Sequence, residues 1–237
     1  SGFLDNIAAA LIGGAVARTV FKGKVHVGYL AGLVAASNAG GAFSVVGDTT
    51  TTMMWIAGIS PLEVIEAIVG TVVAVVIFGI PLSMTQQKYQ PIQADPSSDV
   101  RIDWTRVGVV LSILALAIAV NVVINTRFHE ISDLAPFLGA AVWVAILATA
   151  GLRKPEWKLL PETVQGSLFL LSLVLCASMM PVEKLPTASW QTAFGLGFIS
   201  AVFDNIPLTA LALKQGGYDW GFLAYAVGFG GSMVWFG

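Results

Sequence analysis

Three aspartates stand inside strongly apolar stretches of the chain, at Asp5, Asp48 and Asp204. A carboxylate in such surroundings is costly unless it is solvated or paired, so all three are candidates for a functional site. Asn6 and Asn205 directly follow two of them, and their amides supply both an oxygen ligand and donors that can orient a carboxylate. Asp48 also has an alternative role as the N-cap of the helix that follows it, and capping does not exclude ion binding.

The segment 37–55, "SNAGGAFSVVGDTTTTMMW", interrupts one of the apolar stretches with polar residues and glycines. Asn38 opens it, and three glycines free the backbone to expose its carbonyl groups: Gly40, Gly41 and Gly47. The four threonines 49–52 usually bond back to helix carbonyls, but on one turn one or two hydroxyls should face the site.

These candidate ligands are all oxygen atoms, with no histidine or cysteine among them. Such ligands suit a hard cation such as sodium or lithium, and we hypothesise sodium at Asp5, Asp48 and Asp204. A carboxylate that binds a cation can also bind a proton, so the two compete for one site. We expect no cofactor, since Na⁺ and H⁺ would be the transported species.

Composition places this chemistry in a membrane. Of 237 residues, 56% are hydrophobic and only 11% are charged, and mean hydropathy is +0.81; soluble domains are roughly 25% charged. We therefore expect an integral membrane protein, in the inner membrane of a bacterium, whose partners are the lipid bilayer and small inorganic cations. The net charge of −2 offers no basic field for nucleic acid. A homodimer is compatible with the sequence.

The apolar stretches predict five spans, at 27–58, 61–83, 106–124, 133–151 and 164–180. The last four have 17 to 23 residues, enough to cross about 30 Å of hydrocarbon. The first has 32 and predicts a broken span: a half-helix to about Ser37, an irregular stretch over 38–47 and a second half-helix from Asp48. Residues 189–213 predict a re-entrant hairpin, and 221–237 begin another span.

Lys and Arg residues are concentrated in every second loop. Loops 18–26, 84–106 and 152–163 hold nine of the twelve Lys and Arg residues, and the other three connections hold one each. If each span crosses once, the three richer loops share one side, which the positive-inside rule makes cytoplasmic.

Two motifs recur in the same order. "SGFLDNIAAALI" at 1–12 matches "SAVFDNIPLTAL" at 200–211, and "AGGAFSVVG" at 39–47 matches "FGGSMVWFG" at 229–237, with glycines 230 and 231 in place of the first pair. Five crossings between the copies predict inverted repeats, which in secondary transporters place the site near the membrane midplane. The fold class is therefore all-α polytopic, with re-entrant hairpins and broken helices. We divide the chain into the end of a first repeat (1–83), a polar cytoplasmic linker (84–105) and a second repeat (106–237).

These motifs together resemble the NhaD-type sodium/proton antiporters of the ion transporter superfamily, which also contains arsenite and citrate carriers. The resemblance implies that the chain is a fragment lacking both ends of such a protein. It also implies Asp-Asn pairs at hairpin tips and glycine-rich stretches in broken spans. The ion-binding residues it implies are Ser1, Asp5, Asn6, Asn38, Asp48, Thr50, Thr51, Ser200, Asp204 and Asn205, with Gly40, Gly41, Gly47, Gly230 and Gly231 in the backbone of the breaks.

The sequence favours a sodium (or lithium)/proton antiporter with alternating access, and not an enzyme. One alternative is an anion carrier of the same superfamily for citrate, a dicarboxylate or arsenite, but aspartates at both tips argue against anions. A more remote alternative is an intramembrane aspartyl protease. Those enzymes carry GxGD where this chain reads "VVGD", with Val45 at the first glycine.

Overall fold

The computed structural model describes residues 1–93, 103–128, 130 and 134–233. Within these residues the regular structure is helical and contains no strand, which confirms the all-α prediction. The helices are α1 (Asn6–Val20), α2 (Val27–Gly41), α3 (Thr49–Ile56), α4 (Pro61–Val64), α5 (Ile68–Ala74), α6 (Ile80–Tyr89), α7 (Trp104–Arg127), α8 (Phe137–Thr149), α9 (Leu160–Ser178), α10 (Trp190–Ser200), α11 (Asn205–Gln215) and α12 (Trp220–Gly230).

Three helical stretches of the described chain are long and apolar enough to cross a membrane, Pro61–Tyr89, Trp104–Arg127 and Trp157–Ser178. They confirm helices at three of the predicted spans. The fourth, predicted over 133–151, contains the 13-residue α8, shorter than the roughly 20 residues that a crossing needs. Residue 133 of that prediction lies outside the described residues.

The stretch Pro61–Tyr89 is continuous but locally irregular. It joins α4, α5 and α6 through a 3₁₀ turn (Ile65–Ala67) and a π-helical turn (Val75–Gly79). Pro81 explains the second, because a proline inside a helix has no N–H to donate and its ring clashes with the carbonyl four residues earlier.

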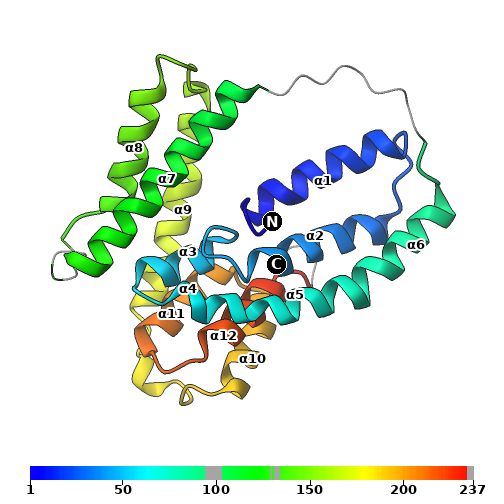
Figure 1. Ribbon diagram of the computed structural model, residues 1–237. Helices are drawn as coiled ribbons and strands as arrows, with labels where there is room; N and C mark the ends of the chain where they lie inside the picture. The colour runs from blue at the N-terminus through cyan, green and yellow to red at the C-terminus, as the bar shows by residue number, and fades with distance from the viewer. Residues whose placement is uncertain (94–102, 129, 131–133, 234–237) are drawn as a thin grey trace. The chain divides into compact units, whose positions relative to one another are not determined.

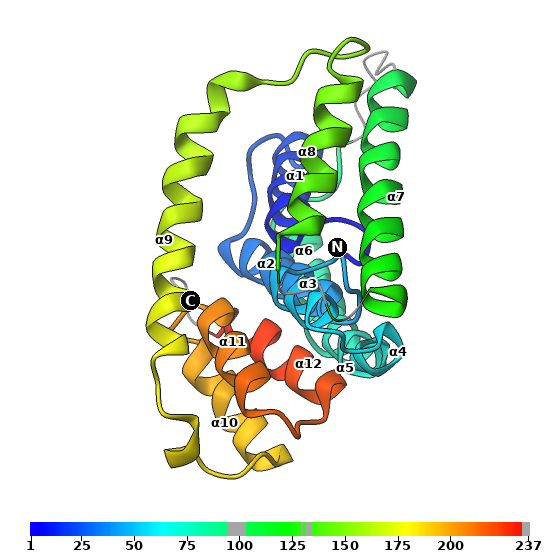
Figure 2. The same ribbon diagram turned by 90° about the vertical axis from the view of Figure 1, so that its left-hand side faces the viewer.

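The chain forms two compact units, one of residues 1–96 and 169–237, the other of residues 97–168. The larger unit combines parts of both predicted repeats, so the division of the sequence at 84–105 stays a prediction. In the larger unit α1, α2 and the α5–α6 stretch lie side by side, and α12 packs against α2, α4 and α10 (Figure 1). The view in Figure 2 shows α10, α11 and α12 gathered together.

Small residues let these helices approach closely. The core around α12 includes fully buried Leu223 and Val227. A Cβ atom on Gly197 of α10 would lie 2.6 Å from the Ala226 carbonyl oxygen of α12, and one on Gly70 would lie 2.6 Å from the Tyr225 ring. The glycines at these two crossings are therefore a packing requirement.

The broken span exists, but its first half is longer than predicted. α2 continues past Ser37 to Gly41, because the helical bonding persists to Ala42, whose N–H donates to the Asn38 carbonyl. The irregular stretch is thus 42–48, with Asp48 at the N-cap position of α3. Asn38, Gly40 and Gly41 belong to the last turn of a helix rather than to the break.

The region predicted as a hairpin is a helix–turn–helix. α10 and α11 have 11 residues each and flank the non-helical residues 201–204. At 1.5 Å per residue each helix is about 16 Å long, half of a hydrocarbon core. These lengths favour a re-entrant hairpin over a crossing, and its position in a bilayer stays a prediction.

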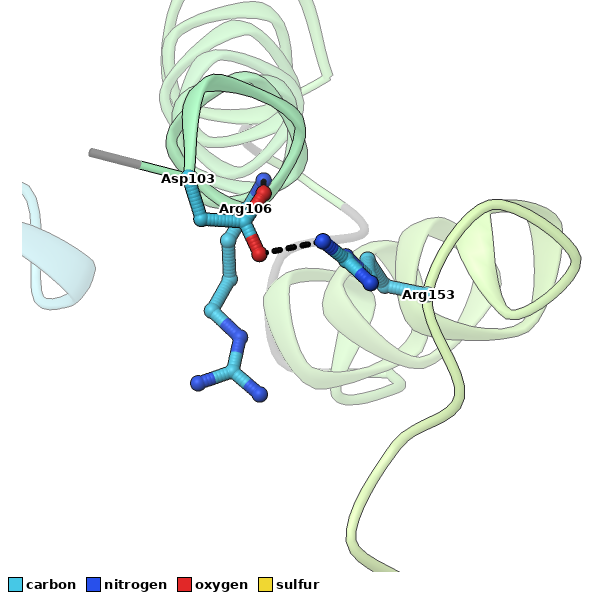
Figure 3. Close-up of polar contacts among 3 residues, drawn as sticks. All are labelled: Asp103, Arg106 and Arg153. Carbon is cyan, nitrogen blue, oxygen red and sulfur yellow. Dashed lines mark hydrogen bonds and ion pairs between the residues drawn. The ribbon is translucent and has the colours of Figure 1, made fainter. Parts of the chain in front are cut away.

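In the smaller unit α7 and α8 pack against each other as antiparallel neighbours. Arg153, just beyond α8, forms an ion pair with Asp103 at the start of α7 (Figure 3). This contact places residues 103–106 and Arg153 at the same end of the helix pair, and the side of a membrane that this end faces stays a prediction.

We predict that Gly197→Ala lowers the thermal unfolding midpoint of the detergent-solubilised protein, because the added methyl group has no room against α12. Overpacking of this kind costs about 1–3 kcal/mol. The matched control is Gly195→Ala on the same helix, where a Cβ meets no atom within 4 Å. It should leave the midpoint unchanged or raise it, since alanine favours helix. Equal midpoints for the two variants would contradict the close packing of α10 on α12.

Candidate functional site

Asp48 is the most deeply buried carboxylate that the structure describes, only 3% exposed at the start of α3. The hydroxyl of Thr50, itself fully buried, donates to Asp48 Oδ2 at 2.5 Å. Although the N–H groups of Thr49 and Thr50 lie close by, the Asp48 side chain makes no capping hydrogen bond to α3. The nearby N–H groups and the Thr50 hydroxyl both stabilise the Asp48 charge at the start of α3, and its role as an ion ligand stays a prediction.

Two neighbouring threonines hold the irregular stretch in shape. Thr51 Oγ1 donates to the carbonyl oxygens of Ser44, at 2.6 Å, and Asp48, at 2.9 Å. Thr52 Oγ1 donates to the Val45 carbonyl at 2.8 Å. Among the four threonines, Thr50 is thus the one whose hydroxyl bonds the buried carboxylate. A ligand role for Thr51 stays a prediction.

The glycines at the end of α2 and in the break allow close packing and are not needed for unusual backbone angles. A Cβ on Gly41 would lie 2.5 Å from the Gly47 carbonyl oxygen, and one on Gly40 would lie 2.5 Å from Ser1 Oγ. None of the residues 38–48 has positive φ. The sequence analysis explained these glycines by backbone freedom, and that explanation was wrong. They are needed because the two ends of the break and Ser1 approach one another closely.

The first Asp-Asn motif docks onto the end of α2 through a chain of hydrogen bonds. Ser1 Oγ donates to the Ser37 carbonyl at 2.5 Å, and Ser37 Oγ donates to the Asn6 carbonyl at 2.6 Å. The buried Asn6 amide then donates to Asn38 Oδ1 at 3.0 Å. The residues expected from the two distant motifs therefore lie together in the structure.

Asp5 lies at the same place and caps α1. Its Oδ1 accepts hydrogen bonds from the N–H groups of Ile7 and Ala8. Asp5 is also near enough to Asp48 for their charges to repel. The structure thus places the first Asp-Asn motif against the end of α2 and next to the break, where a Cβ on Gly47 would lie 3.0 Å from the Ser1 carbonyl oxygen. Asp5 is then within electrostatic range of Asp48.

The second Asp-Asn motif is folded in the same local way but stands apart from this pair. Asp204 is exposed, and its Oδ1 accepts from the Ile206 N–H at the start of α11. Asn205 contributes its backbone carbonyl to a bond from Thr209. No group of three Asp, Glu, His or Cys side chains converges within the described ranges, so the structure does not bring Asp204 to the other two aspartates.

The repeats share one specific contact. Ser200 Oγ donates to the Val227 carbonyl at 2.8 Å, and Ser1 Oγ donates to the Ser37 carbonyl. The two bonds are equivalent, because the motif alignments pair Ser1 with Ser200 and Ser37 with Val227. Gly230 is the last residue of α12 and Gly231 its C-cap, while the equivalent Gly40 and Gly41 are the last two residues of α2.

The ends of α2 and α12 cross each other. Asn38 contacts Ser232, while Ala42 lies beside Gly228, so the two equivalent helices run in opposite directions. Inverted repeats require this arrangement of equivalent helices. The orientation of each copy across a membrane stays a prediction.

Ser232 is a site residue that the sequence analysis missed. Asn38 Nδ2 donates to Ser232 Oγ at 2.8 Å, which extends the chain of hydrogen bonds from Asn6 into the second repeat. The available signal was a hydroxyl in the second glycine-rich motif, at the position that aligns with Ala42.

We predict that Asn38→Ala and Ser232→Ala are non-additive in a double-mutant cycle of thermal stability. Each removes one side of the same hydrogen bond, so the coupling energy should be about 1 kcal/mol. The control cycle combines Asn38→Ala with Ser172→Ala, which changes an exposed serine bonded within its own helix. Additive effects in both cycles would show that the Asn38–Ser232 contact does not join the repeats.

Comparison with known proteins gives matches over nearly the whole chain. This chain is 26% identical over 271 residues to "Sodium/proton antiporter 1" and 25% identical over 272 residues to "Sodium/proton antiporter 2", both of Arabidopsis thaliana. It is 25% identical over 294 residues to "Na(+)/H(+) antiporter NhaD" of Alkalimonas amylolytica. Each match covers 99% of this chain, and the chain covers 46%, 63% and 58% of these relatives in turn.

No family model matches the chain, and no solved structure matches it significantly. The three relatives are named as transporters, which supports the expectation that the chain is not an enzyme. They come from a plant and a bacterium, so they do not identify the membrane that was expected. With its apolar helices, the chain is an integral membrane protein similar along its length to sodium/proton antiporters.

Proposed function

We propose that this chain forms part of the ion-binding core of a sodium(lithium)/proton antiporter. The observation that carries the proposal is the buried Asp48 with its Thr50 hydroxyl at the break after α2, with the first Asp-Asn motif docked beside that break through the bond from Asn6 to Asn38. The names of the relatives support it. Because the chain spans less than two thirds of their length, the remaining ligands and the path for alternating access belong to the whole protein.

Two nearby carboxylates in apolar surroundings give the site its exchange chemistry. Asp5 and Asp48 repel when both are ionised, and either a cation or a proton relieves that repulsion. Binding of one therefore disfavours binding of the other. Sodium and protons would then compete, which is the coupling that an antiporter needs.

The ligand types favour a hard monovalent cation. The side chains gathered at the break offer carboxylate, amide and hydroxyl oxygens, and the described part of this cluster contains no imidazole or thiolate. Oxygen ligands of this kind suit sodium and lithium.

An anion carrier is disfavoured by the helix ends. Anions bind well at free helix N-termini, where N–H groups and the helix dipole attract negative charge. Here Asp5 and Asp204 already occupy the first N–H groups of α1 and α11. An anionic substrate would meet a carboxylate at each of these positions.

We predict that Asp5→Asn and Asp48→Asn each reduce sodium/proton exchange by the whole protein at least tenfold. The amide keeps the size but carries neither the charge nor the exchangeable proton. Asp204→Asn tests the exposed third aspartate in the same assay. Everted vesicles from an antiporter-deficient host report exchange as a cation-dependent change of internal pH, and activity should rise with pH as protons compete less.

Matched controls for this assay are Glu63→Gln and Glu66→Gln, which neutralise exposed carboxylates in the first turns of the predicted span after Pro61. Both should exchange ions normally at equal expression. Normal exchange in Asp5→Asn and Asp48→Asn, or uptake of citrate or arsenite without sodium exchange, would overturn the proposed function.

We also predict that Thr50→Val raises the sodium concentration for half-maximal exchange about fivefold while maximal exchange stays close to normal. Valine keeps the shape but removes one neutral oxygen beside Asp48, at a cost near 1 kcal/mol. The control is Thr49→Val at the adjacent exposed position. If both valine variants have the same sodium dependence as the unaltered protein, Thr50 is not part of the ion site.

A further inference from the structure

A cavity of about 370 Å³ lies in the smaller unit where the ends of α7 and α8 meet. Its rim carries three basic side chains, Arg106, Arg153 and Lys154, together with one acidic side chain, Glu156. The proposed ion site uses none of them. The positive-inside rule accounts for basic residues in these loops but not for their convergence on the rim of one cavity.

The walls of the cavity change character along the helices. On α7 the residues Arg106, Val109 and Ile113 follow one another at i, i+3 and i+7, so they share one face. Ile113 lies about 10 Å further along the axis than Arg106. On the α8 side, Ile146 takes the inner position and Arg153 the outer one. Each wall is thus cationic at the helix end and apolar towards the helix centre.

The two arginines are arranged differently. Arg153 is engaged by Asp103, while the side chain of Arg106 extends away from that ion pair (Figure 3). The hydrogen bond from the Arg106 N–H and the charge of Arg153 keep the pKa of Asp103 below its usual value. Asp103 therefore stays ionised at neutral pH and fixes Arg153 at the rim, while Arg106 remains directed elsewhere.

Two tryptophans mark the same end of the helix pair as a membrane interface. Trp104 begins α7 and Trp157 follows the cavity-lining residues 153–156, and both are exposed. Exposed tryptophans with nearby Lys and Arg are typical of the level of the lipid headgroups. The loops that meet here are also two of the basic loops predicted to be cytoplasmic, the side whose surface carries anionic lipids.

We propose that this cavity binds the phosphate headgroup of an anionic phospholipid, with an acyl chain along Val109, Ile113 and Ile146. Arg106, Arg153 and Lys154 contact the phosphate, and Glu156 opposes it. The apolar inner wall favours a lipid over free phosphate, which would use only the rim. This assignment is independent of the ion site, because every residue involved lies in the smaller unit.

The experiment is native mass spectrometry of the full-length protein in detergent with dioleoyl-phosphatidylglycerol, dioleoyl-phosphatidylcholine or inorganic phosphate added. We expect selective retention of phosphatidylglycerol. The double variant Arg106→Gln/Lys154→Gln should bind it about thirtyfold more weakly, since each basic residue near a membrane surface contributes about a factor of five. Glu156→Gln should bind it more tightly, which tests the assignment without weakening the fold.

The matched control is Lys88→Gln/Arg127→Gln, which removes the same charge from exposed positions outside the cavity. It should bind phosphatidylglycerol as the unaltered protein does. The proposal is overturned if the two double variants retain phosphatidylglycerol equally, if Glu156→Gln has no effect, or if phosphatidylcholine is retained as well. It is also overturned if inorganic phosphate binds with the same dependence on the variants while phosphatidylglycerol does not.

Discussion

Backbone groups that leave a helix in apolar surroundings must find new partners, and this constraint governs the break between α2 and α3. Water cannot satisfy them inside hydrocarbon, and an unsatisfied group there costs several kcal/mol. Side-chain hydroxyls provide hydrogen-bond donors for the free carbonyl groups. Thr51 and Thr52 donate to carbonyls of the irregular stretch, and Thr71 from α5 donates to the Ala39 carbonyl at 2.5 Å. Because these bonds hold the break, the polar atoms beside it can have fixed positions.

The same break explains the packing around it. α2 and α12 end against each other, and the first residues of the chain pass close to Gly40. Such approaches need residues without side chains, while Asn38 supplies the specific link by accepting from Asn6 and donating to Ser232. Glycines therefore allow α2, α12 and the first residues of the chain to approach closely, and the Asn38 side-chain amide fixes their relative position through its two hydrogen bonds.

The hydrogen bonds made by the Asp5 and Asp48 carboxylates leave part of each group's acceptor capacity unused. The capping bonds to Asp5 both end on Oδ1, and the hydroxyl bond to Asp48 ends on Oδ2. A carboxylate has two oxygens and about four lone-pair sites, so each group keeps acceptor capacity for a cation or a proton. A rigid local anchor and an exchangeable ligand are thus compatible in one side chain.

Hydropathy and local patterns in the sequence were enough to predict the all-α fold class, three long apolar helices and the existence of a broken span. Those properties follow from hydropathy, from length and from local motifs, which act over short distances along the chain. They did not predict where α2 ends, because Asn38, Gly40 and Gly41 all have low helix propensity. In the structure these residues are helical and pack against Ser1 and Ser232. The docking of the first Asp-Asn motif on Asn38, and the bond from Asn38 to Ser232, could not be predicted in this way. These relations depend on contacts between residues more than 30 positions apart, which no local pattern encodes.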